Sequence, residues 1–275
     1  MRRNLPLARR FDHRIGPVFW DRFGDDGPDL VLVHGTPFNA AVWADVMPAL
    51  AARARVHVYD LPGYGQSRVA AGTDISLHVQ NQVFADWVAH LGLARPPVVV
   101  GHDFGGATVL RAHLLDGVEM RRLVLVDAVA LRPWGSAFVA HIRDHAAAFA
   151  GLPAHLHRAL VAAYVAEAAH RPIPPAILAD ILDAWGDDHG ARAFYDQIAR
   201  MDPAATDAVV PLLGQMRAPA QVLWGLDDRW LPADQGRALA DRIGCGFTGV
   251  ANAGHLLQLD APAVLVAAVL DRLGC

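Results

Sequence analysis

An aspartate occupies a position where a turn of this kind normally carries a serine nucleophile. The stretch VVVGHDFGGA, residues 98–107, places Asp103 between Gly101 and Gly105 directly after an apolar run. In a strand-turn-helix of this pattern the central side chain protrudes, and glycines flank it because larger residues would collide with nearby backbone. The N-terminus of the following helix favours a negative charge there. The pattern predicts Asp103 as a carboxylate nucleophile, with a helix N-cap as the alternative.

Two later apolar runs end in the residue types that a nucleophile needs beside it. VLWGLDDRWLP, residues 222–232, supplies Asp227 and Asp228, and ANAGHLLQLDAP, residues 251–262, supplies His255. The order nucleophile, acid, histidine is one of the orders in which catalytic triads occur. Asp127 in LVLVDAV follows an earlier apolar run and competes for the role of the acid.

A third turn supplies backbone donors. In VLVHGTPFNAAVW, residues 31–43, the residues His34-Gly35-Thr36-Pro37 follow an apolar run and are expected to form a tight turn. We expect this turn to aim the backbone N–H of Phe38 at the site. The N–H of Phe104, directly after the nucleophile, would complete an oxyanion hole. An ordinary loop is the alternative.

Short apolar runs that alternate with helical-period segments predict the frame that positions these residues. Strands are expected at 29–35, 55–60, 97–103, 122–129, 220–228 and 247–254, and helices near 40–53, 78–92, 104–116, 233–243 and 261–273. An antiparallel pair is expected near 10–23. This alternation is typical of an α/β protein with a mostly parallel sheet and crossover helices.

Between residues 131 and 215 the pattern contains only helices. Four helical segments punctuated by proline and glycine interrupt the alternation there. We interpret residues 1–130 and 216–275 as the core and residues 131–215 as a helical cap inserted over the carboxyl edge of the sheet, where open α/β sheets bind ligands. A structural subdomain without a pocket is the alternative.

Composition excludes several classes of partner. The hydrophobic content of 53% indicates a large buried core, and the net charge of −4 gives no basic surface for nucleic acid. No apolar run approaches the ~20 residues that span a bilayer, and the start lacks the apolar region of a secretory signal. Cys245 and Cys275 form neither a disulfide framework nor a metal set. We expect a cytoplasmic protein with no metal, cofactor, nucleic acid or membrane partner; a homodimer stays open.

Five motifs together resemble the α/β-hydrolase superfamily. They are HGTP (34–37), YDLPGYGQS (59–67), GHDFGG (101–106), WGLDDRWLP (224–232) and GHLLQLDAP (254–262). The resemblance covers roughly residues 25–130 and 216–273 and implies the α/β-hydrolase fold. Asp103 and the GHLLQLDAP stretch resemble more narrowly the branch of epoxide hydrolases and haloalkane dehalogenases. The resemblance favours Asp228 as the acid and leaves Asp227 as a loop residue, with Asp127 as the alternative.

The resemblance implies a covalent mechanism on a small apolar organic substrate and water. A carboxylate is already ionised at neutral pH, so Asp103 could attack a saturated carbon without a base and form an ester. His255 would then activate water to attack the carbonyl carbon of that ester, oriented by the acid.

Leaving-group chemistry favours an epoxide over a halide. Haloalkane dehalogenases of similar sequence offer a Trp after the nucleophile and an Asn in the HG-x-P turn, where this chain has Phe104 and Thr36. Phenylalanine has no donor. An epoxide oxygen needs donors from the cap, usually two tyrosines, and the cap contains Tyr164 and Tyr195.

Other substrates and one non-enzymatic function stay open. Trp134 and His145, close to the start of the cap, could also donate to a leaving group and keep a haloalkane or haloacid dehalogenase open. Hydrolysis of an ester, lactone or carbon–carbon bond is a further alternative. A small-molecule receptor is the non-enzymatic one, and it would have no need of an acid and His255 together.

Overall fold

The strands form one sheet in the order β1-β2-β4-β3-β5-β6-β7-β8. The computed structural model describes residues 5–274, so residues 1–4 and Cys275 lie outside the description. The strands are β1 Arg9–His13, β2 Gly16–Phe23, β3 Asp29–Val33, β4 Arg55–Tyr59, β5 Val98–His102, β6 Arg122–Val126, β7 Ala220–Gly225 and β8 Gly246–Val250. The pairs that involve β1 and β2 are antiparallel, and the pairs from β4 to β8 are parallel.

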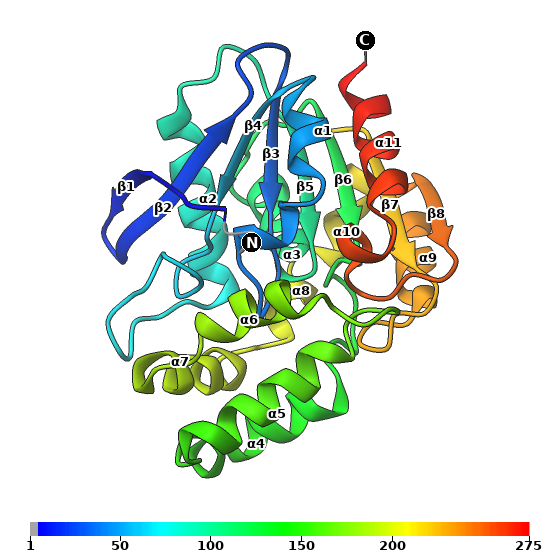
Figure 1. The fold of residues 1–275 in the computed structure, drawn as a ribbon. Coiled ribbons are helices and arrows are strands. Elements are labelled where there is room, and N and C mark those ends of the chain that lie inside the picture. The colour runs from blue at the N-terminus through cyan, green and yellow to red at the C-terminus, as the bar shows by residue number, and fades with distance from the viewer. Residues whose placement is uncertain (1–4, 275) are drawn as a thin grey trace.

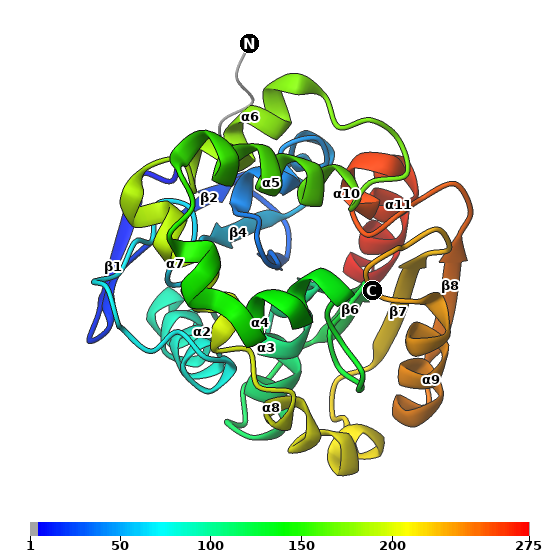
Figure 2. The same ribbon diagram turned by 90° about the horizontal axis from the view of Figure 1, so that it is seen from below.

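Helices cover both faces of this sheet. Helices α2, α3 and α9 lie on one face, and α1 and α11 lie on the other (Figure 2). Every residue of β3 and β5 is buried, as expected for central parallel strands that are covered on both faces. Outside the insertion the helices are η1 Ala40–Trp43, α1 Met47–Ala51, α2 Leu77–Leu91, α3 Phe104–Leu114, α9 Ala233–Ile243, α10 Leu257–Asp260 and α11 Pro262–Leu273.

A helical insertion lies between β6 and β7. Its elements are α4 Ala137–Ala150, α5 Ala154–Ala166, α6 Pro175–Asp183, α7 Asp188–Ala199, α8 Ala204–Asp207 and η2 Val210–Gln215. Helices α4 to α7 lie beyond the carboxyl ends of the parallel strands (Figure 1). The expected fold class, an α/β-hydrolase fold with an inserted helical cap, is confirmed. The domain limits at 130/131 and 215/216 stay predictions.

One predicted helix is broken. The segment 40–53 forms η1 and the separate α1, with Pro48 in the first turn of α1. Proline has no N–H and its ring clashes with the carbonyl four residues earlier, so it is tolerated in a first turn and not in a helix interior. The predicted strands 29–35 and 247–254 end early, at Val33 and Val250, because the residues beyond them form the turns of the site.

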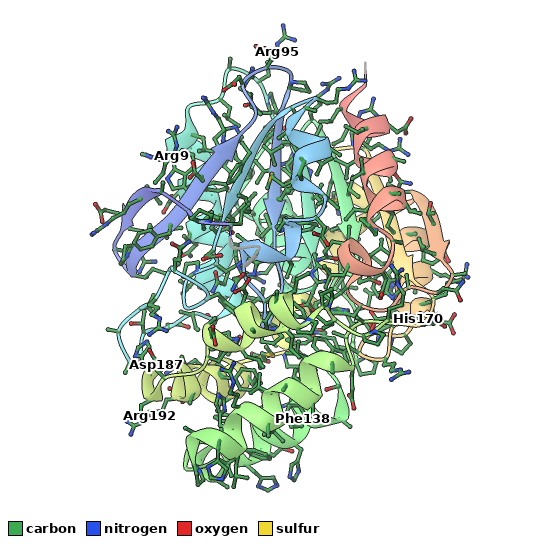
Figure 3. The ribbon with its side chains drawn as sticks, viewed as in Figure 1. Arg9, Arg95, Phe138, His170, Asp187 and Arg192 are labelled. Atoms are coloured by element: carbon green, nitrogen blue, oxygen red, sulfur yellow. The ribbon has the colours of Figure 1, made fainter. Side chains whose placement is uncertain are left out.

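Ion pairs join the cap to the core at its two ends. Arg68 pairs with Asp187 at 2.6 Å, and His170 pairs with Asp227 at 3.1 Å. Asp187 and His170 lie at opposite ends of the boundary between cap and core (Figure 3). These side chains are partly exposed, so the pairs contribute little to stability. Asp227 therefore has a surface contact, as expected for a loop residue.

The turn after β5 packs tightly on the end of β3. A Cβ added at Gly105 would lie 2.4 Å from the carbonyl oxygen of His34 and 2.5 Å from that of Val33. These neighbours are backbone atoms of a central strand, so they cannot move aside cheaply. Glycine at this position lets α3 start directly against β3.

We expect Gly105→Ala to lower the free energy of unfolding by about 2 kcal/mol or more, since overpacking against fixed backbone costs this much. Urea denaturation followed by circular dichroism measures it. Gly246→Ala is the matched control, because an added Cβ there meets nothing within 4 Å. Equal stability of the two variants would contradict the tight packing.

Candidate active site

Asp103 has a strained backbone at the point where β5 passes into α3. Its φ is 50° and its ψ is −119°, a conformation that non-glycine residues rarely adopt. The N–H of Asp103 donates to the carbonyl of Val126, and its own carbonyl accepts from Gly106 and Ala107. The side chain is 4% exposed. The turn therefore holds the carboxylate at the N-terminus of α3, where the helix dipole favours negative charge.

The backbone donor to Asp103 is Thr36 and not Phe38. The N–H of Thr36 donates to Oδ2 of Asp103 at 2.7 Å. The N–H of Phe38, which the sequence led us to expect here, donates to the carbonyl of Gly35 within the turn. Pro37 has no N–H, so a turn that closes from Gly35 to Phe38 leaves only Thr36 to face the site. The sequence alone could have predicted Thr36 as the donor, because it shows Pro37.

Phe104 stays the second expected donor of the oxyanion hole. It is the first residue of α3, and the first N–H groups of a helix have no acceptor within the helix. Its N–H follows directly after Asp103 in the chain. Thr36 and Phe104 together form the candidate oxyanion hole.

His255 bridges two carboxylates. Its Nδ1 lies 2.8 Å from Oδ2 of Asp228, and its Nε2 lies 3.5 Å from Oδ1 of Asp103. The other oxygen of Asp228 accepts the N–H groups of Trp230 and Leu231 at 2.8 and 2.9 Å. The backbone therefore fixes Asp228, which in turn fixes the ring of His255 with Nε2 toward Asp103.

Buried groups hold the His255 loop in place. His102 donates from Nε2 to the carbonyl of His255 at 2.8 Å. Burial and then the charge of His255 lower the pKa of His102 to about 3, so the ring is neutral. Asp260 accepts the N–H of Gly254 at 2.9 Å. The loop is thus tied to the strand that carries the nucleophile.

The charge of His255 depends on its two partners. Burial alone would lower its pKa, but the carboxylates of Asp228 and Asp103 outweigh burial and raise the pKa well above the usual 6.5. The imidazolium form of His255 is therefore favoured. Loss of either carboxylate charge would lower this pKa.

Asp127 lies close by but does not touch His255. Its Oδ1 accepts the N–H of Gly225 at 2.7 Å, and Oδ2 has no hydrogen-bond partner among residues 5–274. Complete burial and then the charge of Asp228 raise its pKa well above 3.8. Its protonated form is therefore favoured relative to that of an ordinary aspartate. The geometry favours Asp228 as the acid.

A narrow cavity adjoins Asp103. Its volume is about 20 Å³, which is room for about one water molecule. Apolar and aromatic side chains dominate its lining. The lining residues are Thr36, Asp103, Phe104, Val129, Trp134, Gly135, Ser136, Val139, Tyr164, Met201, Trp230 and Leu231. Side chains of the cap, among them Trp134, Tyr164 and Met201, therefore lie over the nucleophile.

Two aromatic side chains of this lining stack on each other. The rings of Tyr164 and Trp230 are 4.3 Å apart with an interplanar angle of 8°, and Trp230 also lies 4.9 Å from the ring of His255. Burial and then the charge of Asp103 raise the pKa of Tyr164, so its hydroxyl stays protonated. Trp230 has no role in the sequence prediction. Its position two residues after Asp228 could have predicted that it lies close to the site.

The other expected leaving-group residues divide into two groups. Trp134 lines the cavity, but its Nε1 already donates to the hydroxyl of Thr206 at 2.9 Å. Tyr195 and His145 are not among the described lining residues. The Tyr195 hydroxyl lies 2.8 Å from Nδ1 of His157, and His145 is exposed at a kink of α4. Neither side chain therefore lines this cavity, and their role at a leaving group stays a prediction.

Within residues 5–274, no group of three or more His, Cys, Asp and Glu side chains could hold a metal ion. No helix in this part of the chain is long and apolar enough to cross a membrane.

Comparison with known proteins places this chain in a family. Residues 30–269 match the alpha/beta hydrolase family. The chain belongs to this family. A solved alpha/beta hydrolase fold protein from Burkholderia ambifaria is 47% identical, with a TM-score of 0.93, and the match covers 97% of this chain and 98% of that one. This family membership identifies the chain as an α/β-hydrolase enzyme.

Other relatives of this α/β-hydrolase match less of its length or share only its fold. A pimeloyl-[acyl-carrier protein] methyl ester esterase of Aeromonas hydrophila subsp. hydrophila is 56% identical over 109 residues, which are 38% of this chain and 39% of that one. The chain spans about two fifths of the length of the curated relatives it matches. The epoxide hydrolase CorEH has a TM-score of 0.77 at 20% identity, with 96% of both chains covered.

We expect Asp228→Asn to bring the pKa of His255 well below its wild-type value, because a carboxylate that raises it is lost. Asp127→Asn, the matched control, should change it much less, because Asp127 bonds the N–H of Gly225 while Asp228 bonds the ring of His255. NMR titration of the His255 ring, assigned with His255→Gln, measures both. A large fall with Asp127→Asn and none with Asp228→Asn would give the role of the acid to Asp127.

Proposed function

We propose that this hydrolase works through a covalent ester of Asp103, with His255 and Asp228 completing its catalytic triad. The observation that supports this most directly is the hydrogen bond from the N–H of Thr36 to Oδ2 of Asp103. If the oxyanion formed on the carbonyl group of a substrate, its N–H donor would have to be free to bind that oxygen. Here the donor already holds the enzyme's own carboxylate, as expected if the tetrahedral intermediate forms on the side chain of Asp103.

In the first step Oδ1 of Asp103 attacks a saturated carbon of the substrate. Oδ2 stays on Thr36, which orients the other oxygen toward the cavity. A carboxylate needs no general base for this attack. The bond to the leaving group breaks, and Asp103 becomes a neutral ester.

In the second step water attacks the carbonyl carbon of that ester. Once Asp103 is esterified, one of the two carboxylates that raise the pKa of His255 is lost, so the ring loses its proton more readily. Neutral His255 takes a proton from water through Nε2, and Asp228 stabilises the resulting imidazolium. Thr36 and Phe104 bind the oxyanion. Collapse of the intermediate releases an alcohol and restores Asp103.

The substrate that this site suits best is a small, mostly apolar epoxide. The cavity is lined largely by apolar and aromatic groups, which favours an uncharged organic molecule. Tyr164 stays protonated beside Asp103 and supplies a donor for the oxygen that leaves carbon. A halide has a poorer site, because the position after the nucleophile is Phe104 and the indole N–H of Trp134 is engaged by Thr206.

Ester hydrolysis is the second candidate. It is favoured by the 56% identity over 109 residues with a relative named as a methyl ester esterase. In that reaction Asp103 and His255 would activate water for direct attack on the carbonyl of the substrate. Oδ2 of Asp103 would then have to release the N–H of Thr36 so that the substrate's oxyanion could bind there.

We expect His255→Gln to accumulate the ester, because glutamine cannot serve as the base of the second step. Incubation with a panel of epoxides, haloalkanes and simple esters, followed by intact mass and peptide mapping, should show a peptide containing Asp103 that has gained the mass of an epoxide. The control, His255→Gln combined with Asp103→Ala, should gain none. Unlabelled His255→Gln, with a wild type that hydrolyses esters, would exclude the covalent mechanism.

Isotope transfer separates the two candidates in the wild-type enzyme. We expect a single turnover in H₂¹⁸O, with enzyme in excess, to place ¹⁸O in the carboxylate of Asp103 and none in the product, since water attacks the enzyme ester. Mass spectrometry of the peptide and of the product measures this. Label found only in the product would mean direct attack by water and would favour the esterase.

We expect the fraction of wild-type enzyme present as ester to rise as the pH falls. His255 must be neutral for the second step, and protonation below its pKa in the ester form removes the base. Attack by the Asp103 carboxylate requires no base, so the first step is less affected. Acid-quenched intact mass at steady state, from about pH 5 to about pH 9, measures the fraction. A fraction that rises with pH instead would mean that His255 does not limit the second step.

A further inference from the structure

The turn that carries Thr36 is held by hydrogen bonds on the sides that do not face Asp103. The N–H of Leu61 donates to Nε2 of His34, so the proton of this ring is on Nδ1, which donates to the carbonyl of Gly35 at 2.9 Å. Burial lowers the pKa of His34 to about 4, which keeps the ring neutral and this arrangement intact. The core therefore fixes the start of the turn.

The next two residues of the turn are held from the cap. The hydroxyl of Thr36 donates to Oε1 of Gln197 at 2.8 Å, and Nε1 of Trp185 donates to the carbonyl of Pro37 at 2.8 Å. Gln197 lies on α7, and Trp185 lies in the connection between α6 and α7. These two residues are 4% and 2% exposed, so water has little access to replace either bond.

Hydrogen bonds inside the cap fix Trp185 in turn. Its backbone carbonyl lies 3.0 Å from Nε2 of His157, and the hydroxyl of Tyr195 lies 2.8 Å from Nδ1 of the same ring. A carbonyl can only accept, so Nε2 carries the proton, and in the neutral ring Nδ1 accepts the hydroxyl of Tyr195. Burial lowers the pKa of His157, which favours that neutral ring. A chain of hydrogen bonds therefore runs from Tyr195 through His157 and Trp185 to Pro37.

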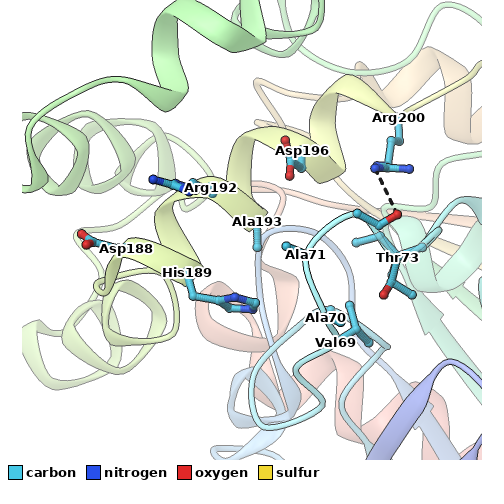
Figure 4. Close-up of a pocket in the computed structure, with 13 residues that line it drawn as sticks. Val69, Ala70, Ala71, Thr73, Asp188, His189, Arg192, Ala193, Asp196 and Arg200 are labelled. Carbon is cyan, nitrogen blue, oxygen red and sulfur yellow. Dashed lines mark hydrogen bonds between the residues drawn. The ribbon is translucent and has the colours of Figure 1, made fainter.

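Helix α7 directs Gln197 inward and a neighbouring residue outward. The outer face of the helix lines a groove of about 370 Å³ against residues 69–73, with Asp196 among the lining side chains (Figure 4). Asp196 is exposed and directly precedes Gln197. Adjacent residues on a helix point in different directions, so a change at Asp196 alters the outer face and leaves the hydroxyl of Thr36 its acceptor.

Both bonds from the cap act on the orientation of the Thr36 N–H. The hydroxyl belongs to the same residue as this N–H, and the carbonyl of Pro37 belongs to the next one. A rotation of the turn that moved the N–H away from Asp103 would therefore strain or break a bond to the cap. A donor to a developing oxyanion is effective because it is held in place before the reaction.

We propose that Gln197 and Trp185 are positioning residues of the cap, which hold the turn so that the N–H of Thr36 stays directed at Asp103. Neither is among the described residues that line the cavity, and neither needs to touch the substrate. Both act through the turn. The inference rests on the proposed function for the catalytic role of Thr36, whereas the orientation of the turn is a property of the free enzyme.

The first test uses the enzyme without substrate. Hydrogen exchange followed by NMR measures local opening at the N–H of Thr36, and the N–H of Val31 in the buried β3 reports opening of the whole fold. We expect Gln197→Met and Trp185→Phe to speed exchange at Thr36 relative to Val31 by roughly 2- to 10-fold, the range that one hydrogen bond covers. Asp196→Asn is the matched control and should leave the ratio unchanged. An unchanged ratio in both cap variants would overturn the proposal.

The second test measures the step in which Thr36 binds the oxyanion. Rapid quench and intact mass follow the decay of the Asp103 ester formed from styrene oxide, a terminal aryl epoxide, with His255 intact. We expect Gln197→Met to slow this decay by at least about 10-fold, which is less than the full loss of an oxyanion donor. Asp196→Asn should decay at the wild-type rate.

A double-mutant cycle shows whether Gln197 acts through the hydroxyl of Thr36. Thr36→Val removes this hydroxyl and keeps the N–H, so it should slow ester decay about as much as Gln197→Met does. The double variant should be no slower than either single variant, since both changes break one bond. Thr36→Ser, which keeps the hydroxyl, should retain most of the wild-type rate.

The remaining outcomes are distinct. Fully additive effects of Gln197→Met and Thr36→Val would mean that Gln197 acts by another route and would overturn its role, as would normal ester decay in spite of faster exchange at Thr36. If no epoxide labels Asp103 in His255→Gln, the proposed function fails, while the exchange ratio still tests the bonds from the cap. Should Gln197→Met not fold, Thr36→Val removes the same bond and replaces it in the exchange test.

Discussion

The close approach of two backbone turns is the constraint on which the site depends. Gly105 lies against the carbonyl groups that end β3, and a Cβ added at Gly35 would lie 2.4 Å from Cβ of Asp103. This close approach of the two turns brings the N–H of Thr36 to 2.7 Å from the carboxylate of Asp103. The left-handed backbone of Asp103 costs about 1–3 kcal/mol, and the buried parallel strands on either side hold it there. Packing of the strands thus fixes the orientation of the Asp103 carboxylate.

The same sheet brings the remaining groups to the nucleophile. Asp228 follows β7 and His255 follows β8, and parallel strands end at one edge, so side chains distant in sequence meet there. Hydrogen bonds fix both groups. Two backbone N–H groups bind the carboxylate of Asp228, and the ring of His102 binds the backbone carbonyl of His255. This support gives the imidazole one orientation before any substrate arrives.

The sequence predicted what local patterns control and failed where packing decides. The strands, the turn at Asp103 and the neighbours Asp228 and His255 follow from apolar runs and glycines that act over a few residues. The rotation of a cap helix about its axis depends on distant contacts. It turned Tyr195 toward His157 and Gln197 toward the core, which spacing alone could not show. The N–H of Thr36 is an intermediate case, since the geometry of the turn would have revealed it.

The raised pKa of Asp127 has a consequence for the electrical balance of the site. Burial and the charge of Asp228 favour the protonated form of Asp127, so this side chain adds less negative charge beside Asp103 and Asp228 than an ordinary aspartate would. An anionic substrate would enter against this charge with little water to screen it, and an anionic product would be repelled on the way out. In the proposed mechanism, esterification of Asp103 and loss of the His255 proton remove one charge of each sign, so the net charge of the site does not change. Under that mechanism the site would disfavour anionic molecules at every stage, whatever their shape.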